Sequence, residues 1–351
     1  MNILYLLNIL IIFTCVILHI RKTKWLGLIF VIEVLFLIVV RSFVVPDSVS
    51  DLNYYIQIYD MTKDCNIAEL PDLIGIVEPF YLFLNYVCSR FSTDYSFFLL
   101  LYNIFLFYSY YKFIKNYSSA PYLSCILTIL IMMNQSVYVV RQHLAIAIIL
   151  FSYKYILERN LLKYIAIIGL ATCTHYSAAV FTPIYFCANI ENKHKYIATL
   201  ISSSAILIFT FGYLLSFVAG VNEKYAELYI NTEENAPVTN FLIQFCFFVT
   251  TIYFCGKEVL NNQRKKIFFT VLFFGMLLCL AGFQLYLVAR LALYFTVVNI
   301  VIVANNYYWT RNKIRGLYIF SVLLLLYIIY HMQFAPGIGV GSFDFNIHPI
   351  I

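Results

Sequence analysis

Long apolar runs recur along the chain and restrict its fold more than any other feature. Most extend for roughly 17–25 residues, the length that crosses a bilayer as an α-helix. With 63% hydrophobic and only 11% charged residues, the chain of 351 residues is not a soluble globular protein. Hydrocarbon offers backbone amides no partner, so such runs must be helical. We expect an all-α polytopic integral membrane protein with about 10 transmembrane helices plus re-entrant or broken half-helices. It would form one domain, 1–351.

Charged residues between the runs indicate their orientation. Three turns rich in Lys and Arg are expected in the cytoplasm, where such residues are enriched. They lie at 21–24, 264–266 and 311–315. Acidic loops at about 45–94 and 221–240 would then be external, as would the tail 333–351. The net charge of +6 therefore reflects inner loops, and no nucleic acid is expected as a partner.

The cysteine pattern argues against a metal centre. The nine cysteines include no CxxC pair and show no disulfide framework. We therefore expect no bound metal and no cofactor.

One segment near the middle of the chain poses a topological problem. Lys163 and Lys193 are both expected inside, so the residues between them must cross the membrane an even number of times. Two half-length helices, Leu161–Cys173 and Tyr176–Asn189, satisfy this condition with His175 at the turn. One long tilted span is the alternative, and it requires the loop after this segment to be external. The broken helix is the favoured interpretation.

Two helix starts carry recognisable signals. Glu78-Pro79 begins a short aromatic segment, 77–91, because proline is tolerated at the first helical position. This segment is expected to be interfacial or re-entrant. Asp94 is an N-cap candidate for the following span, 95–114.

Three polar side chains stand at unfavourable positions on the outer side of this topology. Arg141, His175 and Arg290 each precede an apolar helix that runs inward. Helix N-termini favour anions, and two guanidinium groups can clamp a pyrophosphate by bidentate hydrogen bonds. The alternative is that the arginines anchor outer headgroups and the histidine is an ordinary interfacial residue. Ionisable residues at membrane depth are functional candidates by default, so one shared site is favoured.

Neighbouring residues extend this candidate site. Gln142 and His143 follow the first arginine, but adjacent helical residues point in different directions, so only one is expected to line the site. Asp51, Tyr54 and Glu78 place external carboxylates among aromatic rings, a mixture that suits carbohydrate. A carboxylate there can also act as general base on an acceptor hydroxyl. A solvated acidic loop with ordinary interfacial tyrosines is the alternative.

Five short motifs stand in order from the first outer loop to the last. They are Asp51-x-x-Tyr54, Glu78-Pro79, Val140-Arg141-Gln142-x-Leu144-Ala145, Thr174-His175-Tyr176-Ser177-Ala178 and Ala289-Arg290. In their order and spacing they resemble the EpsG family. These are Wzy-type polysaccharide polymerases of bacterial capsule, O-antigen and exopolysaccharide clusters.

The resemblance implies a multi-pass glycosyltransferase of the bacterial cytoplasmic (inner) membrane, with a GT-C-like architecture. Its metal-independent active site would face the periplasm or cell exterior. There a growing glycan would pass from undecaprenyl pyrophosphate to a lipid-linked oligosaccharide repeat unit. Arg141 and Arg290 would hold the pyrophosphate, while Asp51, Glu78 or His175 would orient or deprotonate the acceptor hydroxyl. Membrane lipid, a chain-length regulator and a flippase are the expected partners.

Other functions share several of these features. An O-antigen ligase or other lipid-linked glycosyltransferase uses the same donor, but ligases carry a larger late outer loop than 221–240. A membrane O-acyltransferase using His175 or His143 is a more distant alternative. A lipid-linked oligosaccharide flippase needs polar residues along its spans toward the cytoplasm. In this sequence the charged candidate site residues are expected at one outer face, which argues against a flippase.

Overall fold

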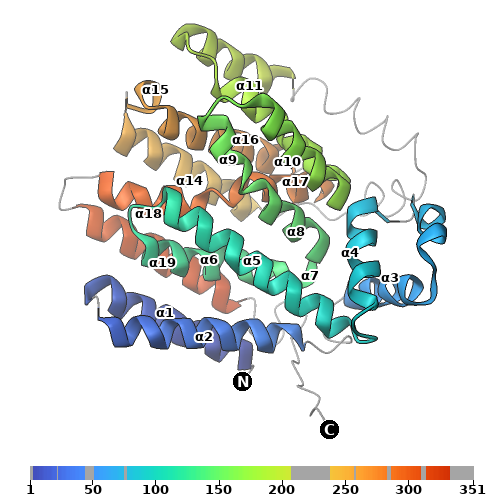
Figure 1. Ribbon diagram of the computed structural model, residues 1–351. Coiled ribbons are helices and arrows are strands. Elements are labelled where there is room, and N and C mark those ends of the chain that lie inside the picture. Colours follow the sequence, from blue (N-terminus) through green and yellow to red (C-terminus); the bar gives the residue numbers. More distant parts are fainter. Residues whose placement is uncertain are drawn as a thin grey trace.

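Helices make up nearly all of the secondary structure (Figure 1). The computed structural model describes residues 3–21, 23–43, 51–74, 77–206, 238–256, 258–282, 286–309 and 314–332. Within these ranges the only β-type pairing is an isolated bridge between Ile74 and Val77. The all-α class is confirmed, and the long apolar helices are those of a membrane protein.

The first two helices form a hairpin at one edge of the molecule (Figure 1). They are α1, Ile3–Ile20, and α2, Lys24–Ser42, and each is long and apolar enough to cross a membrane. Thr14 Oγ1 donates to Glu33 Oε1 at 2.9 Å. This bond gives the only carboxylate in the two helices a partner, as a buried charged or polar group requires.

A small layer of short helices flanks the long ones at the right of Figure 1. It contains α3, Leu52–Asp64, the 3₁₀ helix η2, Ile67–Leu73, and α4, Pro79–Ser89. Glu78 is the N-cap of α4 and Pro79 is its first residue, as the sequence predicts. Proline is suited to this position because a first-turn amide has no helical acceptor to lose.

The next helix, α5, spans Tyr95–Tyr117 and is the longest single helix described. Asp94 caps it as expected, since its Oδ1 accepts a hydrogen bond from the Ser96 amide at 2.8 Å. Its apolar length also qualifies it as a candidate membrane span.

The apolar runs on either side of Arg141 predict one continuous helix each, 121–140 and 142–157, but both are interrupted in the structure. The pieces are α6 (Pro121–Thr128), the π-helical η3 (Ile129–Met133), α7 (Gln135–Tyr138), α8 (Val140–Ile149) and α9 (Ser152–Leu157). The chain leaves helical geometry at Val139, with φ −107° and ψ 59°. This break makes Arg141 a first-turn residue of α8, where backbone amides lack helical acceptors.

The middle segment folds back on itself at His175. This residue is extended (φ −156°, ψ 115°) between α10, Leu161–Thr174, and the 3₁₀ helix η4, Tyr176–Phe181. The Tyr164 hydroxyl donates to the Phe181 carbonyl at 2.6 Å, so the two arms lie against each other.

The ends of this hairpin also meet. The short helix α11, Pro183–Ala188, completes the returning arm, and beyond it Glu191 forms an ion pair with Arg159. The structure therefore contains the two short helices that the charge pattern favoured, and not one long span.

The C-terminal half adds further helices. A helix begins at residue 193 and is described to residue 206. The others are α14 (Val238–Cys255), α15 (Glu258–Asn261), α16 (Gln263–Ala281), α17 (Tyr286–Thr296), α18 (Asn299–Trp309) and α19 (Ile314–Met332). A Cβ on Gly282 would lie 2.8 Å from the Ala289 Cβ, so glycine allows α16 and α17 to approach closely. Most of the predicted loop 221–240 and all of the tail 333–351 lie outside the described residues.

The described residues contain four helices long and apolar enough to cross a membrane. A fifth candidate is the pair Val288–Thr296 and Asn299–Tyr308, which is bent by 44°. The expected number of about ten spans is not confirmed. The predicted run from residue 121 to 140 is one that is interrupted, and it leaves the shorter apolar helix Pro121–Met133.

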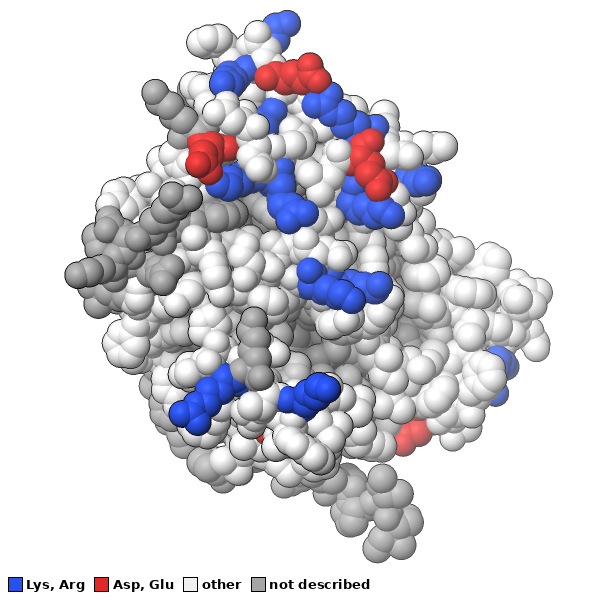
Figure 2. All heavy atoms as spheres, turned by 60° about the vertical axis from the view of Figure 1, so that its left-hand side comes forward, with Lys and Arg blue, Asp and Glu red and all other residues white. Residues whose placement is uncertain are grey.

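Lys and Arg gather toward the top of the molecule in Figure 2. Several contacts join segments there: Arg264 lies over the Tyr117 ring, and the Lys266 ammonium donates to the Ile190 carbonyl. We call this region the basic end. Its cations include Lys154, Arg159, Lys163, Lys193, Arg264 and Lys265.

Cysteine labelling tests the hairpin topology. Because Arg159 and Glu191 meet, Lys163→Cys and His194→Cys in a cysteine-free background should react from the same side of the membrane. That side should be the cytoplasm, whereas Tyr54→Cys, on α3, should react from outside. If Lys163→Cys and His194→Cys react from opposite sides, the chain crosses only once between them.

Candidate functional site

A buried carboxylate joins three distant parts of the chain. Glu78 is 4% exposed. Its Oε2 accepts from Arg141 Nη1 at 2.7 Å, and its Oε1 lies 2.6 Å from His175 Nδ1. Both distances are those of short, charge-assisted hydrogen bonds. Three of the predicted site residues therefore form one connected group.

Each of these side chains comes from a helix end. Glu78 precedes α4 and is held there by Pro79 at the first helical position. Arg141 follows the break at Val139, and His175 is the extended residue after α10. Helix ends leave backbone groups without helical partners, so polar side chains are favoured there.

Arg141 and His175 keep Glu78 ionised. Burial would raise the pKa of this carboxyl, but the hydrogen bond from His175 and the charge of Arg141 outweigh it and lower the pKa to about 2. A carboxylate of such low basicity, with both oxygens already bonded, is a poor general base. Glu78 is therefore better suited to orient its partners than to accept a proton.

His175 is the group in this site that is placed to accept a proton. An ionised Glu78 only accepts hydrogen bonds, so His175 Nδ1 carries the hydrogen. In the neutral ring, Nε2 then has the free lone pair. The side chain is 22% exposed, and within the described residues its only hydrogen bond is the one to Glu78.

Arg141 is held by aromatic rings as well as by Glu78. Its guanidinium carbon lies 5.4 Å from the Tyr54 ring centroid and 5.6 Å from that of Tyr55. Such cation–π contacts favour the planar guanidinium. Tyr54 is 40% exposed, so one of the two rings also has an open face.

Asp51 and Arg290 lie within electrostatic range of the Tyr55 hydroxyl. The pKa of Tyr55 is raised to about 12, chiefly by burial; the charge of Arg141 lowers it, Asp51 raises it, and Arg290 lowers it by less. Asp51 is the N-cap of α3, although its side chain makes no capping hydrogen bond. Tyr55 thus lies among charges from three separate helices.

Two hydrogen bonds attach α17 to this group. The buried Gln142 amide donates through Nε2 to the Arg290 carbonyl at 2.7 Å. The Ser177 hydroxyl, two residues after His175, lies 2.9 Å from the Tyr294 hydroxyl. Tyr294 is four residues after the arginine and thus on the same face of α17. These contacts hold α17 against both α8 and η4.

The structure brings together most of the predicted residues but separates one. Glu78, Arg141, His175 and Tyr54 are in contact, and Gln142 links this group to the Arg290 backbone. His143 instead points into the core: it is 0% exposed, and neither ring nitrogen has a hydrogen-bond partner. Adjacent residues of α8 point in different directions, which explains the separation.

Sequence reasoning missed three contacting residues, Tyr55, Ser177 and Tyr294. Tyr294 has a detectable signal, since its spacing of four from Arg290 places it on the same helical face. Ser177 is part of the motif around His175, although no role was predicted for it, and Tyr55 is adjacent to Tyr54 with no local pattern that distinguishes it from the other tyrosines. Among the described residues, no cluster of three or more His, Cys, Asp or Glu could hold a metal ion.

Replacing the central carboxylate tests its structural contribution. Glu78→Gln should destabilise the protein at neutral pH by about 3 kcal/mol, since the pKa falls from 4.5 to about 2. The folded-state pKa is depressed, so this stabilisation is present above about pH 4.5 and is lost as pH falls toward 2. Thermal unfolding in detergent should show a wild-type loss of stability in this window that the variant lacks.

Glu191→Gln is the matched control. This carboxylate pairs with Arg159 on the surface, where ion pairs contribute little. The unfolding temperature of Glu191→Gln at neutral pH should stay close to that of wild type. Equal unfolding temperatures for Glu78→Gln and Glu191→Gln would contradict the central role of Glu78.

Comparison with known proteins places this site in a family. A family model described as the EpsG family matches residues 27–337, which include every residue of the site. No curated protein and no solved structure matches the chain. The EpsG family is associated with glycosyltransferase-like polymerase activity in exopolysaccharide synthesis. Because the match covers most of its length, the chain belongs to the EpsG family.

Proposed function

We propose that the protein is a Wzy-type polymerase that extends a lipid-linked glycan at the outer face of the cytoplasmic membrane. The donor would be a glycan on undecaprenyl pyrophosphate, and the acceptor a lipid-linked repeat unit. The observation that carries this proposal is the bridging of Arg141 and His175 by buried Glu78. It places a group that binds anions beside a group that accepts protons, and transfer from a pyrophosphate requires both.

His175 is the general base of the proposed reaction. The acceptor hydroxyl passes its proton to His175 Nε2, and its oxygen forms the new bond to the anomeric carbon of the donor. The anomeric carbon–oxygen bond to the pyrophosphate breaks, and the leaving oxygen keeps the electron pair. Glu78 orients the ring through Nδ1 and stabilises the imidazolium that forms.

Arg141 and Arg290 hold the pyrophosphate and offset the charge that develops on it. Arg141 contributes a planar fork already restrained by Glu78 and two tyrosine rings. Arg290 is partly buried at the α17 position that Gln142 fixes through the backbone. Both residues are then positioned before the substrate binds, which lowers the entropy lost on binding.

The sugar-binding part of the site includes exposed aromatic surface. Tyr54 is 40% exposed beside Arg141, and Tyr176, the residue after His175, is 53% exposed. Aromatic faces cover the C–H surfaces of sugars, and nearby Asp51 offers a carboxylate to hydroxyl groups. In this proposal Asp51 binds the acceptor and is not the base.

An outer-facing site in a GT-C-like architecture agrees with the helix lengths. The 14 residues of α10 rise about 21 Å from the basic end to His175, less than the roughly 30 Å of a hydrocarbon core. With the basic end in the cytoplasm, the site would lie in a recess beneath the outer surface. Such a recess suits a donor whose pyrophosphate is anchored by a lipid tail.

Complementation of cells that lack this protein tests the assignment of the base. When it is expressed in such cells, His175→Ala should reduce the rate of chain extension by about 100-fold or more, the usual contribution of a general base. His194→Ala changes a histidine at the basic end, and it should restore the ladder of long glycan chains as well as wild type does. Restored long chains with His175→Ala would overturn the assigned role.

The glycan that accumulates in the null strain distinguishes the alternatives. Single repeat units support a polymerase. Long chains that are not attached to their final acceptor indicate a ligase. Lipid-linked units retained on the inner face indicate a flippase.

A charge-conserving change tests the pyrophosphate clamp. Arg141→Lys should lower polymerisation by about tenfold to a hundredfold, because lysine loses a charge-assisted hydrogen bond and the planar fork. Arg159→Lys, in a surface ion pair at the basic end, is the control and should be fully active. Full activity of Arg141→Lys in the same ladder assay would refute the clamp.

A further inference from the structure

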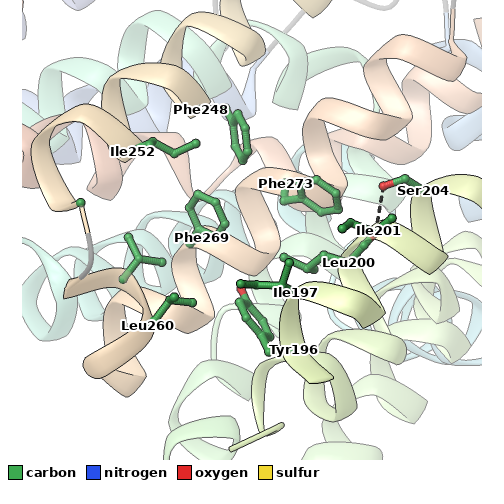
Figure 3. Close-up of a pocket in the computed structure, with 12 residues that line it drawn as sticks. Tyr196, Ile197, Leu200, Ile201, Ser204, Phe248, Ile252, Leu260, Phe269 and Phe273 are labelled. Atoms are coloured by element: carbon green, nitrogen blue, oxygen red, sulfur yellow. Dashed lines mark hydrogen bonds between the residues drawn. The ribbon is translucent and has the colours of Figure 1, made fainter. Parts of the chain in front are cut away.

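A cavity lies away from Glu78, beside the basic end. It has a volume of about 480 Å³ and opens between the 193–206 helix, α14, α15 and α16 (Figure 3). Apolar side chains cover it almost completely, including Ile197, Ile201, Phe248, Phe269 and Phe273. Its character differs from that of the polar site around Glu78.

The few polar atoms of the cavity wall are already bonded. The Tyr196 hydroxyl lies 2.9 Å from the Thr270 hydroxyl, and the Ser204 hydroxyl donates to the Leu200 carbonyl at 2.9 Å. Figure 3 shows the Phe269 and Phe273 rings between the other lining side chains. The interior of the cavity therefore suits a hydrocarbon chain and not a sugar or a phosphate.

Lysines stand at one end of this cavity. Lys193 precedes the lining residue Ile197 by four positions, and Lys265 precedes the lining residue Phe269 by four, so each lies on the lining face of its helix. The Lys266 ammonium lies 4.8 Å from the ring centroid of Tyr196, which also lines the cavity.

Two acidic residues offset part of the charge at this end. Glu258, on α15, pairs with Lys265, and Glu191 pairs with Arg159. Lys193 and the Lys266 ammonium, which donates to the Ile190 carbonyl, leave the mouth of the cavity positively charged, so it is complementary to an anionic headgroup.

The length of the cavity matches one leaflet of a bilayer. Eleven residues separate Lys193 from Ser204, the most distant lining residue of the same helix, which corresponds to about 16 Å. Half of a hydrocarbon core is about 15 Å. An acyl chain of one leaflet fits this length, whereas a polyprenyl chain of 55 carbons is much longer.

We propose that this cavity binds an anionic phospholipid of the leaflet at the basic end. An acyl chain would lie against Ile197, Ile201 and Phe269, and the phosphate would lie beside Lys193. This site is separate from the proposed glycan-transfer site and does not depend on the function assigned to it.

Native mass spectrometry of the delipidated full-length protein tests this proposal. Phosphatidylglycerol should bind more tightly than phosphatidylcholine of the same chain length. Lys193→Gln should weaken phosphatidylglycerol binding about fivefold, since one lysine near a lipid surface contributes about 1 kcal/mol. Ile201→Trp, at a 65% exposed lining position, should abolish tight binding of either lipid by filling the cavity.

Two variants at the same end serve as controls. Lys163→Gln and Leu162→Trp change an exposed lysine and an 82% exposed leucine that do not line the cavity, so both should bind lipid as wild type does. Equal affinity for the two phospholipids, or unchanged binding by both Lys193→Gln and Ile201→Trp, would overturn the proposal. Preferential binding of a polyprenyl phosphate would assign the cavity to a different occupant and equally reject it.

Discussion

One buried carboxylate between an arginine and a histidine holds the polar site together. Glu78, with only 4% of its surface exposed, would be strongly unfavourable as an ionised group without partners. Arg141 and His175 supply those partners at 2.7 and 2.6 Å. Because each oxygen bonds to a different segment, the carboxylate fixes the start of α8 relative to the end of α10. The aromatic contacts of Arg141 then join α3 to the same unit.

The polar side chains of the candidate site lie at interruptions and ends of helices, and not in their regular parts. A continuous helix in hydrocarbon satisfies all of its backbone groups, and a break exposes some of them. Breaks at Val139 and His175 are therefore stable only inside protein or beside a wet cavity, and both lie in the polar site. The bend between α17 and α18 follows the same helix that carries Arg290. The positions that disturb a simple membrane helix are thus the positions where polar side chains converge.

The polar site and the basic end differ in the kind of ligand that each would suit. Around Glu78, cations are matched to a buried carboxylate and to tyrosine rings. At the basic end, the exposed Lys193 and the less exposed Lys265 and Lys266 lie at one end of an apolar cavity. The polar group suits a charged, sugar-bearing substrate, while the cavity suits a hydrocarbon chain with an anionic headgroup. This cavity is therefore separate from the site of the proposed chemistry.

The helical class, the starts of α4 and α5, and the turn at His175 could all be predicted from the amino-acid sequence. These features follow from local rules: apolar length, proline at a first helical position, capping by aspartate, and the parity required by the positions of Lys163 and Lys193. The sequence also indicated most of the polar residues that meet in the site, because such residues are unfavourable near hydrocarbon unless they have partners.

Which of these residues contact one another could be seen only in the tertiary structure. The contact of Glu78 with Arg141 and His175 spans 63 and 97 positions, a separation that no local pattern encodes. Packing also interrupted the predicted runs around Arg141 and buried His143 in the core. For the same reason Glu78, a candidate base from the sequence, is better suited in the structure to orient its partners. Its basicity is set by the charges packed against it, and these charges come together only when distant helices do.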